Sequence, residues 1–174
     1  MAGSLVKIDE EIVTSAVASV TLTGIDSTYD VYMVRINNAT VSANLGNITP
    51  RVTVSGTADS TANYDIAGKQ LKSNTTFGNS YNTNQTSFTC FGAGGTGTGE
   101  QSNIIMYLFN FNNASEYSFI TFEEVMYDQN PFLLGNQGGG VHTVAQSCDG
   151  IEFKVDAGAY NFTGGNFVLY GLKK

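Results

Sequence analysis

The chain has 174 residues and a net charge of −7; 41% of its residues are hydrophobic and only 13% are charged. The acidic balance argues against nucleic acid as a partner, because phosphate binding needs clustered Lys and Arg, and against an anionic membrane surface for the same reason. The many Gly, Ser, Thr and Asn residues beside Val, Tyr and Phe are typical of short strands joined by polar turns.

The N-terminal part of the chain alternates β-branched with polar residues. A short strand is predicted over residues 4–9 and a long alternating strand over residues 12–23. A helix over residues 9–20 is the alternative, since the acidic run at its start resembles a helix N-terminus. The dense Val, Ser and Thr content favours the strand. Gly24 then opens a polar turn that ends at Thr28.

Three later segments are apolar on both faces of a predicted strand: residues 29–37, 103–110 and 166–172. In the first of them one face carries Tyr29, Val31 and Met33, and the other carries Tyr32, Val34 and Ile36. Strands of this kind are covered on both sides. We therefore predict two-sided burial for the first two segments and place the first and third in the central body of the fold.

The middle of the chain is more polar. Residues 41–50 are predicted to be a loop or an irregular edge segment, and residues 51–55 a short strand. Residues 56–85 are rich in Ser, Thr and Asn, and this composition predicts a surface excursion that holds short strands and variable contacts. A strand is predicted to follow over residues 86–91.

A long strand is predicted over residues 117–127. Glu123 and Glu124 place one carboxylate on each of its faces, so one of them must lie near the sheet end or face a polar neighbour. The Gly-, Asn- and Gln-rich residues 128–140 are predicted to be a loop whose apolar triplet, residues 132–134, plugs the end of the fold or docks on a partner.

Short strands over residues 141–145 and 151–155 complete the pattern before the last strand. The whole chain, residues 1–174, thus predicts one all-β domain, an antiparallel jelly-roll-like sandwich of about 8–11 strands. The first strand segment, about residues 1–11, is a candidate for use in assembly.

No motif in the sequence indicates catalysis, a cofactor or a metal. Residues 92–97 match G-x-G-x-x-G, but no helix or βαβ unit follows, so a hairpin loop is the better interpretation. His142 is predicted to be exposed at a strand end, and no G-x-S-x-G elbow accompanies it. The acidic runs at residues 9–11 and 123–124 cannot supply a glycosidase pair by themselves, because adjacent strand residues point to opposite faces.

Other polar residues have simpler explanations. The oxygen side chains of Asp26, Ser27, Thr28 and Asp30 do not have the spacing of a calcium loop and are better explained by turn capping. No apolar run is long enough for a membrane helix, and the N-terminus lacks a signal-peptide pattern. Cys90 and Cys148 are therefore predicted to be reduced thiols, with one disulfide between them as the alternative.

Two segments carry a resemblance to a known group. The stretch GIDSTYDVYMVRINN, residues 24–38, is similar to an early turn and strand of small bacteriophage virion proteins, and GGNFVLYGLKK, residues 164–174, resembles their closing G-x-F-x-L-Y-G-x-K strand. Members of the group serve as capsid decoration, head-fibre or tail-fibre proteins. The resemblance implies a jelly-roll-like domain in a symmetric assembly, and it carries over no catalytic residues.

We therefore expect a non-enzymatic virion protein that decorates the capsid exterior as a homotrimer, contacts the major capsid protein and assembles in the bacterial cytoplasm. The candidate subunit or capsid contacts are Leu5, Val6, Ile8, Phe132, Leu133 and Leu134. Ordinary core packing is the alternative for these six residues. The second functional hypothesis is a tail-fibre or receptor-binding protein that recognises host glycan, with Tyr64 and Tyr81 of the polar tract as contacts.

Overall fold

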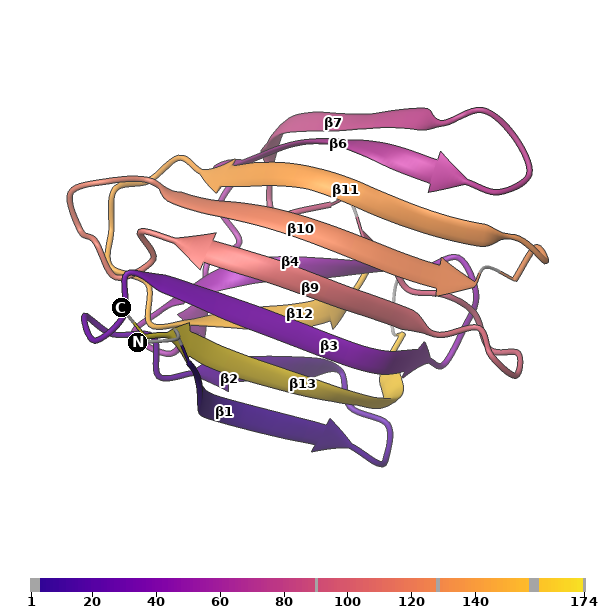
Figure 1. The fold of residues 1–174 in the computed structure, drawn as a ribbon. Coiled ribbons are helices and arrows are strands. Elements are labelled where there is room, and N and C mark those ends of the chain that lie inside the picture. The colour runs from indigo at the N-terminus through magenta and orange to yellow at the C-terminus, as the bar shows by residue number, and fades with distance from the viewer. Residues whose placement is uncertain (1–3, 90, 128, 157–159, 174) are drawn as a thin grey trace.

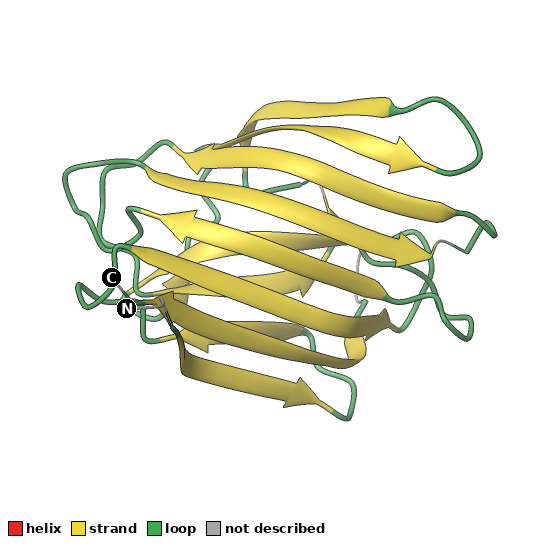
Figure 2. Cartoon of the chain, in the orientation of Figure 1, coloured by secondary structure: helices red, strands yellow, loops and turns green. Residues whose placement is uncertain are grey.

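The structure is a computed structural model that describes residues 4–89, 91–127, 129–156 and 160–173. Within these residues the chain forms strands joined by turns and loops, without a helix (Figure 2). Two antiparallel sheets pack face to face, so the fold is the all-β, jelly-roll-like sandwich that the sequence predicts. The described residues accordingly contain no helix that could cross a membrane.

The larger sheet has eight strands in the order β1-β13-β3-β9-β10-β11-β6-β7. Their bounds, in that order, are Leu5–Val13, Phe162–Leu172, Val31–Val41, Ser102–Phe109, Ser118–Tyr127, Leu133–His142, Tyr64–Lys72 and Gly78–Gln85. Figure 1 looks onto the outer face of this sheet, with the smaller sheet behind it. The hairpin of β6 and β7 forms one edge of the sheet, and β1 forms the other.

The smaller sheet has the order β2-β12-β4-β5, and β8 pairs with β4 beside this path. The bounds are Ser19–Thr23 for β2, Gly150–Val155 for β12, Asn47–Val54 for β4, Thr57–Ala58 for β5 and Phe91–Gly92 for β8. Its inward side chains interlock with those of the larger sheet in one continuous apolar core. Fully buried aromatic rings dominate this core, including Phe88, Phe153, Phe162 and Phe167.

The predicted single strand over residues 12–23 is wrong, because the chain changes sheets within it. β1 ends at Val13 in the larger sheet, and β2 begins at Ser19 in the smaller one. Between them, Val17 and Phe162 exchange two backbone hydrogen bonds of 3.0 and 2.9 Å. Alternation continues through such a crossing, so the pattern could not reveal it; Ile12 is 62% exposed although Leu22, on the same parity, is buried.

β3 and β13, which hold the two segments of the resemblance, are neighbouring antiparallel strands inside the larger sheet. The predicted central position is therefore confirmed for both. The predicted two-sided burial is wrong for β9, because the smaller sheet covers only its inner side (Figure 1). On β3 the prediction holds in part, since the outward-facing Met33 is buried and Val31 is half-buried. On β9, Ile105 and Tyr107 are exposed while Ile104 and Met106 are buried.

The predicted loop over residues 128–140 is also wrong, because most of it is β11, a strand between β10 and β6. Its glycines let aromatic rings pack on bare backbone: a Cβ at Gly138 would lie 3.0 Å from the Phe122 ring, and one at Gly140 only 2.8 Å from the Phe88 ring. The glycine-rich composition therefore reflects crowding inside the sheet here, although glycine usually indicates a turn.

Two smaller differences concern the middle of the chain. β3 continues to Val41 and β4 begins at Asn47, so the predicted loop over residues 41–50 is shorter than expected. Of the described residues in the strand predicted over 86–91, only Phe91 lies in a strand, as the first residue of β8. Most of the polar tract forms the hairpin of β6 and β7, whose register shifts between Tyr64 and Ile66 and whose polar side chains suit the exposed edge of a sheet.

Candidate functional site

The outer face of the larger sheet carries a broad group of exposed apolar side chains. Strand alternation points them away from the core, over β7, β9, β10 and β11. This apolar face consists of Tyr81, Ile105, Tyr107, Phe119, Val125, Tyr127 and Leu133, with exposed fractions of 37–76%. Within the described residues, the second sheet of the sandwich lies on the opposite side and does not cover them (Figure 1).

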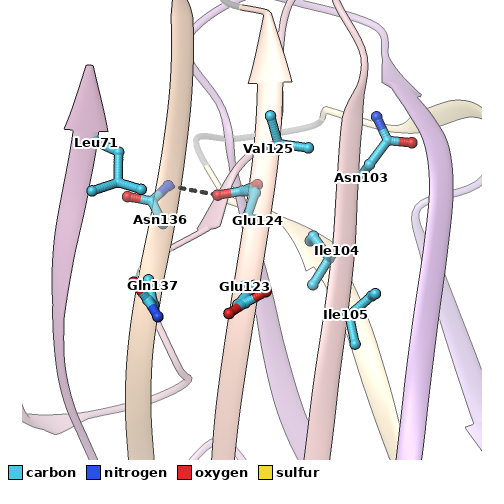
Figure 3. A pocket seen from close by; sticks show the side chains of 9 residues that line it. All are labelled: Leu71, Asn103, Ile104, Ile105, Glu123, Glu124, Val125, Asn136 and Gln137. Carbon is cyan, nitrogen blue, oxygen red and sulfur yellow. Dashed lines mark hydrogen bonds between the residues drawn. The ribbon is translucent and has the colours of Figure 1, made fainter. Parts of the chain in front are cut away.

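Two hollows lie on this face along β11, where glycines replace side chains. One, of about 370 Å³, is lined by Leu71, Val125 and Ile105 among others, and Gly135 stands between Leu71 and Val125 in the strand register. Figure 3 shows its lining from β6, β11, β10 and β9. The other, of about 630 Å³, lies over Gly139 and is bounded by residues that include Tyr81 and Phe119.

A polar row separates the two hollows. Lys69 on β6, Gln137 on β11 and Glu123 on β10 are direct register partners across the three strands. All three side chains are exposed. The Lys69 ammonium donates a hydrogen bond to the side-chain oxygen Oδ1 of Asn79 on β7. The apolar face is thus crossed by one band with a cation on one side of β11 and an anion on the other.

The remaining part of the outer face, over β1, β13 and β3, holds several polar contacts of its own, although Arg35 Nε has no hydrogen-bond partner among the described residues. Lys7 Nζ lies 2.7 Å from Glu10 Oε2, and Asn166 Nδ2 donates to Glu10 Oε1 at 2.8 Å. Arg35 donates to Asn166 Oδ1 at 3.4 Å and lies 5.8 Å above the Tyr170 ring. The pKa of Glu10 is lowered, mainly by the hydrogen bond that Lys7 donates to its carboxylate.

A buried carboxyl group lies beneath the apolar face. Glu124, which alternates with Glu123 on β10, is only 6% exposed. Its carboxyl oxygens accept hydrogen bonds from Ser102 Oγ at 2.6 Å, Asn136 Nδ2 at 2.5 Å (Figure 3) and the Gly92 amide at 2.9 Å. Burial raises its pKa to about 7 in spite of these donors, which lower it. The prediction that one of the two carboxylates faces polar neighbours is confirmed.

His142 is fully buried at the end of β11, so the predicted exposure is wrong. Its ring centroid lies 4.7 Å from that of Tyr64, and Nε2 lies 3.2 Å from Asp59 Oδ2. The geometry of this contact is not that of a hydrogen bond. Neither Nε2 nor Nδ1 has a hydrogen-bond partner among the described residues. Burial lowers the pKa of His142, against the opposite influence of Asp59.

The structure brings a serine, a histidine and an aspartate into one region without making a nucleophile accessible. Ser118 is the register partner of His142, but it is fully buried, and its hydroxyl lies 3.8 Å from Cys148 Sγ. Cys148 is a free, buried thiol whose pKa burial raises to about 11. These groups therefore lie out of reach of a substrate. Cys90, the other predicted thiol, lies outside the described residues.

The six residues predicted to contact another subunit or the capsid differ in their exposure. Leu5 and Leu133 are exposed, and Val6, Ile8 and Phe132 are half-buried. Leu134 is 6% exposed and points inward on β11, so its proposed use as an interface residue is wrong.

The two predicted glycan contacts also differ. Tyr64 is fully buried, with its hydroxyl donating to the Asp59 carbonyl at 2.7 Å, and cannot contact a glycan. Tyr81 is exposed at the rim of the Gly139 hollow, as a contact residue must be. The polar composition of the tract could not distinguish an inward from an outward tyrosine.

Of the two motifs with simple explanations, the turn at Asp26 is as predicted, whereas the hairpin predicted at residues 92–97 is wrong, because β8 pairs with β4 and β9 lies in the larger sheet. The Asp26 carboxylate accepts the Thr28 amide at 2.7 Å, which is a turn cap. In the glycine loop, Glu100 Oε2 accepts the Gly97 amide at 2.7 Å, so that amide is already bonded within the chain. The described residues hold no group of three or more His, Cys, Asp or Glu side chains that could bind a metal.

No protein-family model matches the chain, and no curated protein sequence matches it. Among solved structures, a fructofuranosidase from Schwanniomyces occidentalis complexed with fructosylnystose aligns with 98% of this chain and 34% of that enzyme. The identity is 10% and the TM-score is 0.26. The chain thus spans only a minor part of that enzyme, and so weak a likeness does not establish an enzymatic activity.

Proposed function

We propose that the protein is a non-enzymatic structural protein of a bacteriophage virion that decorates, or cements, the outside of the capsid. The observation that carries this proposal is the apolar face, because a large exposed apolar surface on a rigid domain is typical of a protein-contact site. The resemblance of residues 24–38 and 164–174 to phage virion proteins supports the same assignment. The partners are further copies of the chain and the major capsid protein.

The location of the titratable groups supports a role without catalysis. Glu124, His142 and Cys148, the residue types that most often act as acids, bases or nucleophiles, are enclosed by the core. Their shifted pKa values follow from burial, which also accompanies purely structural groups.

An electron-microscopy map of the virion tests this function directly. We expect many copies of the sandwich on the outer surface of the shell, in contact with the major capsid protein. Antibody labelling of intact particles gives an independent measurement of the same location. A few copies at the tail would contradict decoration and favour the second candidate below, and absence from purified particles would contradict both.

The second candidate is a tail-fibre or receptor-binding protein for host surface glycan, and one observation favours it. The Gly139 hollow places Tyr81 and Phe119 beside the polar side chains of Asp65, Asn82 and Thr83. Aromatic walls with a few polar groups are typical of small-ligand sites, in which the apolar surface packs and the polar atoms orient the ligand.

Titration of the protein with surface polysaccharide from the host tests this candidate. Loss of the exposed ring in Tyr81→Ala is expected to weaken binding at least about tenfold if the hollow is the site. Tyr127→Ala, which removes another exposed tyrosine away from the Gly139 hollow, is the matched control. Equal loss in both variants, or no binding by the unaltered protein, would exclude this hollow as a glycan site.

A further inference from the structure

We propose that two copies of this chain pair face to face through the outer surface of the larger sheet, about a twofold axis that runs along β11. This inference goes beyond the decoration role and does not depend on it, because it concerns only the chain and its own copy. It is carried by the area of the apolar face, by the position of its glycines and by the order of its charges across the strands.

The area is of the size that a stable pair needs. The seven side chains of the apolar face are 37–76% exposed. At roughly 150–250 Å² for a whole aromatic side chain, they present on the order of 600 Å² of apolar surface. A standard interface buries about 800 Å² on each partner, and the polar row with the small residues between the strands supplies the rest. A single patch of this size is at the upper end for a monomer.

The position of the axis follows from the shape of the face. At Gly135 and Gly139, β11 has no outward side chain, so the apolar face is hollowed along this strand. Side chains of β10 on one side, and of β6 and β7 on the other, border the two hollows. Two sheets that pack face to face lie about 10 Å apart with nearly aligned strands. A twofold axis along β11 then places β10 of each copy over β6 of the other and β9 over β7.

The strand register becomes self-complementary under this rotation. Lys69 and Glu123 flank Gln137 at equal distances in the sheet, so Lys69 of each copy faces Glu123 of the second copy. The register partners of Gly135 meet in the same way, so that Leu71 faces Val125 of the second copy. Because of the twofold symmetry each contact occurs twice in the pair, so a substitution changes two contacts of the interface.

The outermost strands of the face also match. Tyr81 on β7 and Tyr107 on β9 belong to the row of Gly139, so they face one another across the interface. Asp65 faces Phe119 of the second copy, but its carboxylate already accepts the Asn84 amide at 2.8 Å on its own sheet. The charged part of the outer face over β1, β13 and β3 is occupied by its own ion pair and hydrogen bonds and lies outside the pair.

Charge reversal combined with measurement of mass in solution tests the proposal. At about 100 µM, well above a micromolar Kd, the unaltered chain is expected to sediment as two copies. Lys69→Glu or Glu123→Lys alone places two like-charged pairs in the interface and is expected to weaken pairing at least about tenfold. The double variant restores opposite charges and is expected to return to within about threefold of the unaltered chain.

Matched controls keep the change of net charge constant. Lys154→Glu and Glu152→Lys make the same charge changes on β12 of the smaller sheet, and we expect them to leave pairing unchanged. All four positions lie outside the hydrophobic core, so the variants are expected to keep the fold, which circular dichroism checks.

Cross-linking gives a second readout that needs no charge change. Gln137 lies on the proposed axis, so a short bismaleimide is expected to join two copies of Gln137→Cys but not of Glu152→Cys, with the unaltered chain as the background. A monomer at about 100 µM overturns the proposal. A mass of three copies also overturns it, in favour of the expected homotrimer, and a double variant that stays as weak as the single ones overturns this register.

Discussion

Strand β10 of the larger sheet carries large apolar side chains on both of its faces, yet only one of these faces is covered. On β10 the inward side chains Ile120 and Phe122 are 2% and 3% exposed, whereas the outward Phe119 and Val125 are 43% and 46% exposed. The inner face packs on the smaller sheet of the same chain, and the outer face has no counterpart among the described residues. A sheet that is apolar on both sides normally has two covers, so the uncovered side is where a partner is expected.

The largest difference between the faces is expected for alanine substitutions of two aromatic residues of β10, one on each face. Phe122→Ala removes a ring that packs 4.6 Å from Phe91 and is expected to lower the free energy of unfolding by about 3–5 kcal/mol. Phe119→Ala removes an exposed ring and is expected to change it by less than about 1 kcal/mol. Urea unfolding at a protein concentration at which the chain is monomeric measures both. Equal losses would show that the outer face is also packed.

A smaller difference concerns the two adjacent glutamates. The folded state holds the proton of Glu124, since its pKa rises from 4.5 to about 7. Between these values the unfolded chain loses the proton first, so stability falls as pH rises, by roughly 3 kcal/mol in total. Glu124→Gln is expected to remove this loss, and its stability relative to the unaltered chain should therefore increase from pH 4.5 to above 7.

Glu123→Gln is the control for that measurement, because the Glu123 side chain is exposed on the outer face. It is expected to leave the pH profile of unfolding unchanged. The two variants are compared by thermal or urea unfolding across the pH range. A profile that Glu124→Gln does not alter would mean that the buried carboxyl group titrates as it does in water.

The smallest effect is expected from His142, whose contribution has the opposite sign. Burial lowers its pKa below 6.5, so below that pH the unfolded chain binds a proton that the folded chain resists. Stability attributable to His142 is therefore complete above pH 6.5 and is lost as pH falls. His142→Gln is expected to flatten this acid branch of the unfolding profile. An unchanged branch would assign the acid sensitivity to other groups, such as Asp59.

Only part of the candidate site could be predicted from the sequence. The parity of Phe119, Val125 and Tyr127 is visible in the alternation of β10, but alternation does not say which parity faces the core. The partner of His142, Asp59, lies in the polar tract, where its side chain resembles any other turn residue. The hollows along β11 were missed because glycine-rich strands resemble loops in composition.

What the sequence determined by itself is the kind of fold and its local elements. Period-two alternation specifies the long strand β10, and Asp26 specifies its turn by capping the Thr28 amide. These are short-range effects that any chain with the same local residues shares. The tertiary structure alone decided that residues 14–18 cross between sheets, that residues 133–142 form an inner strand and that one apolar face stays uncovered. Each of these depends on what packs opposite, which the residues of a single strand do not encode.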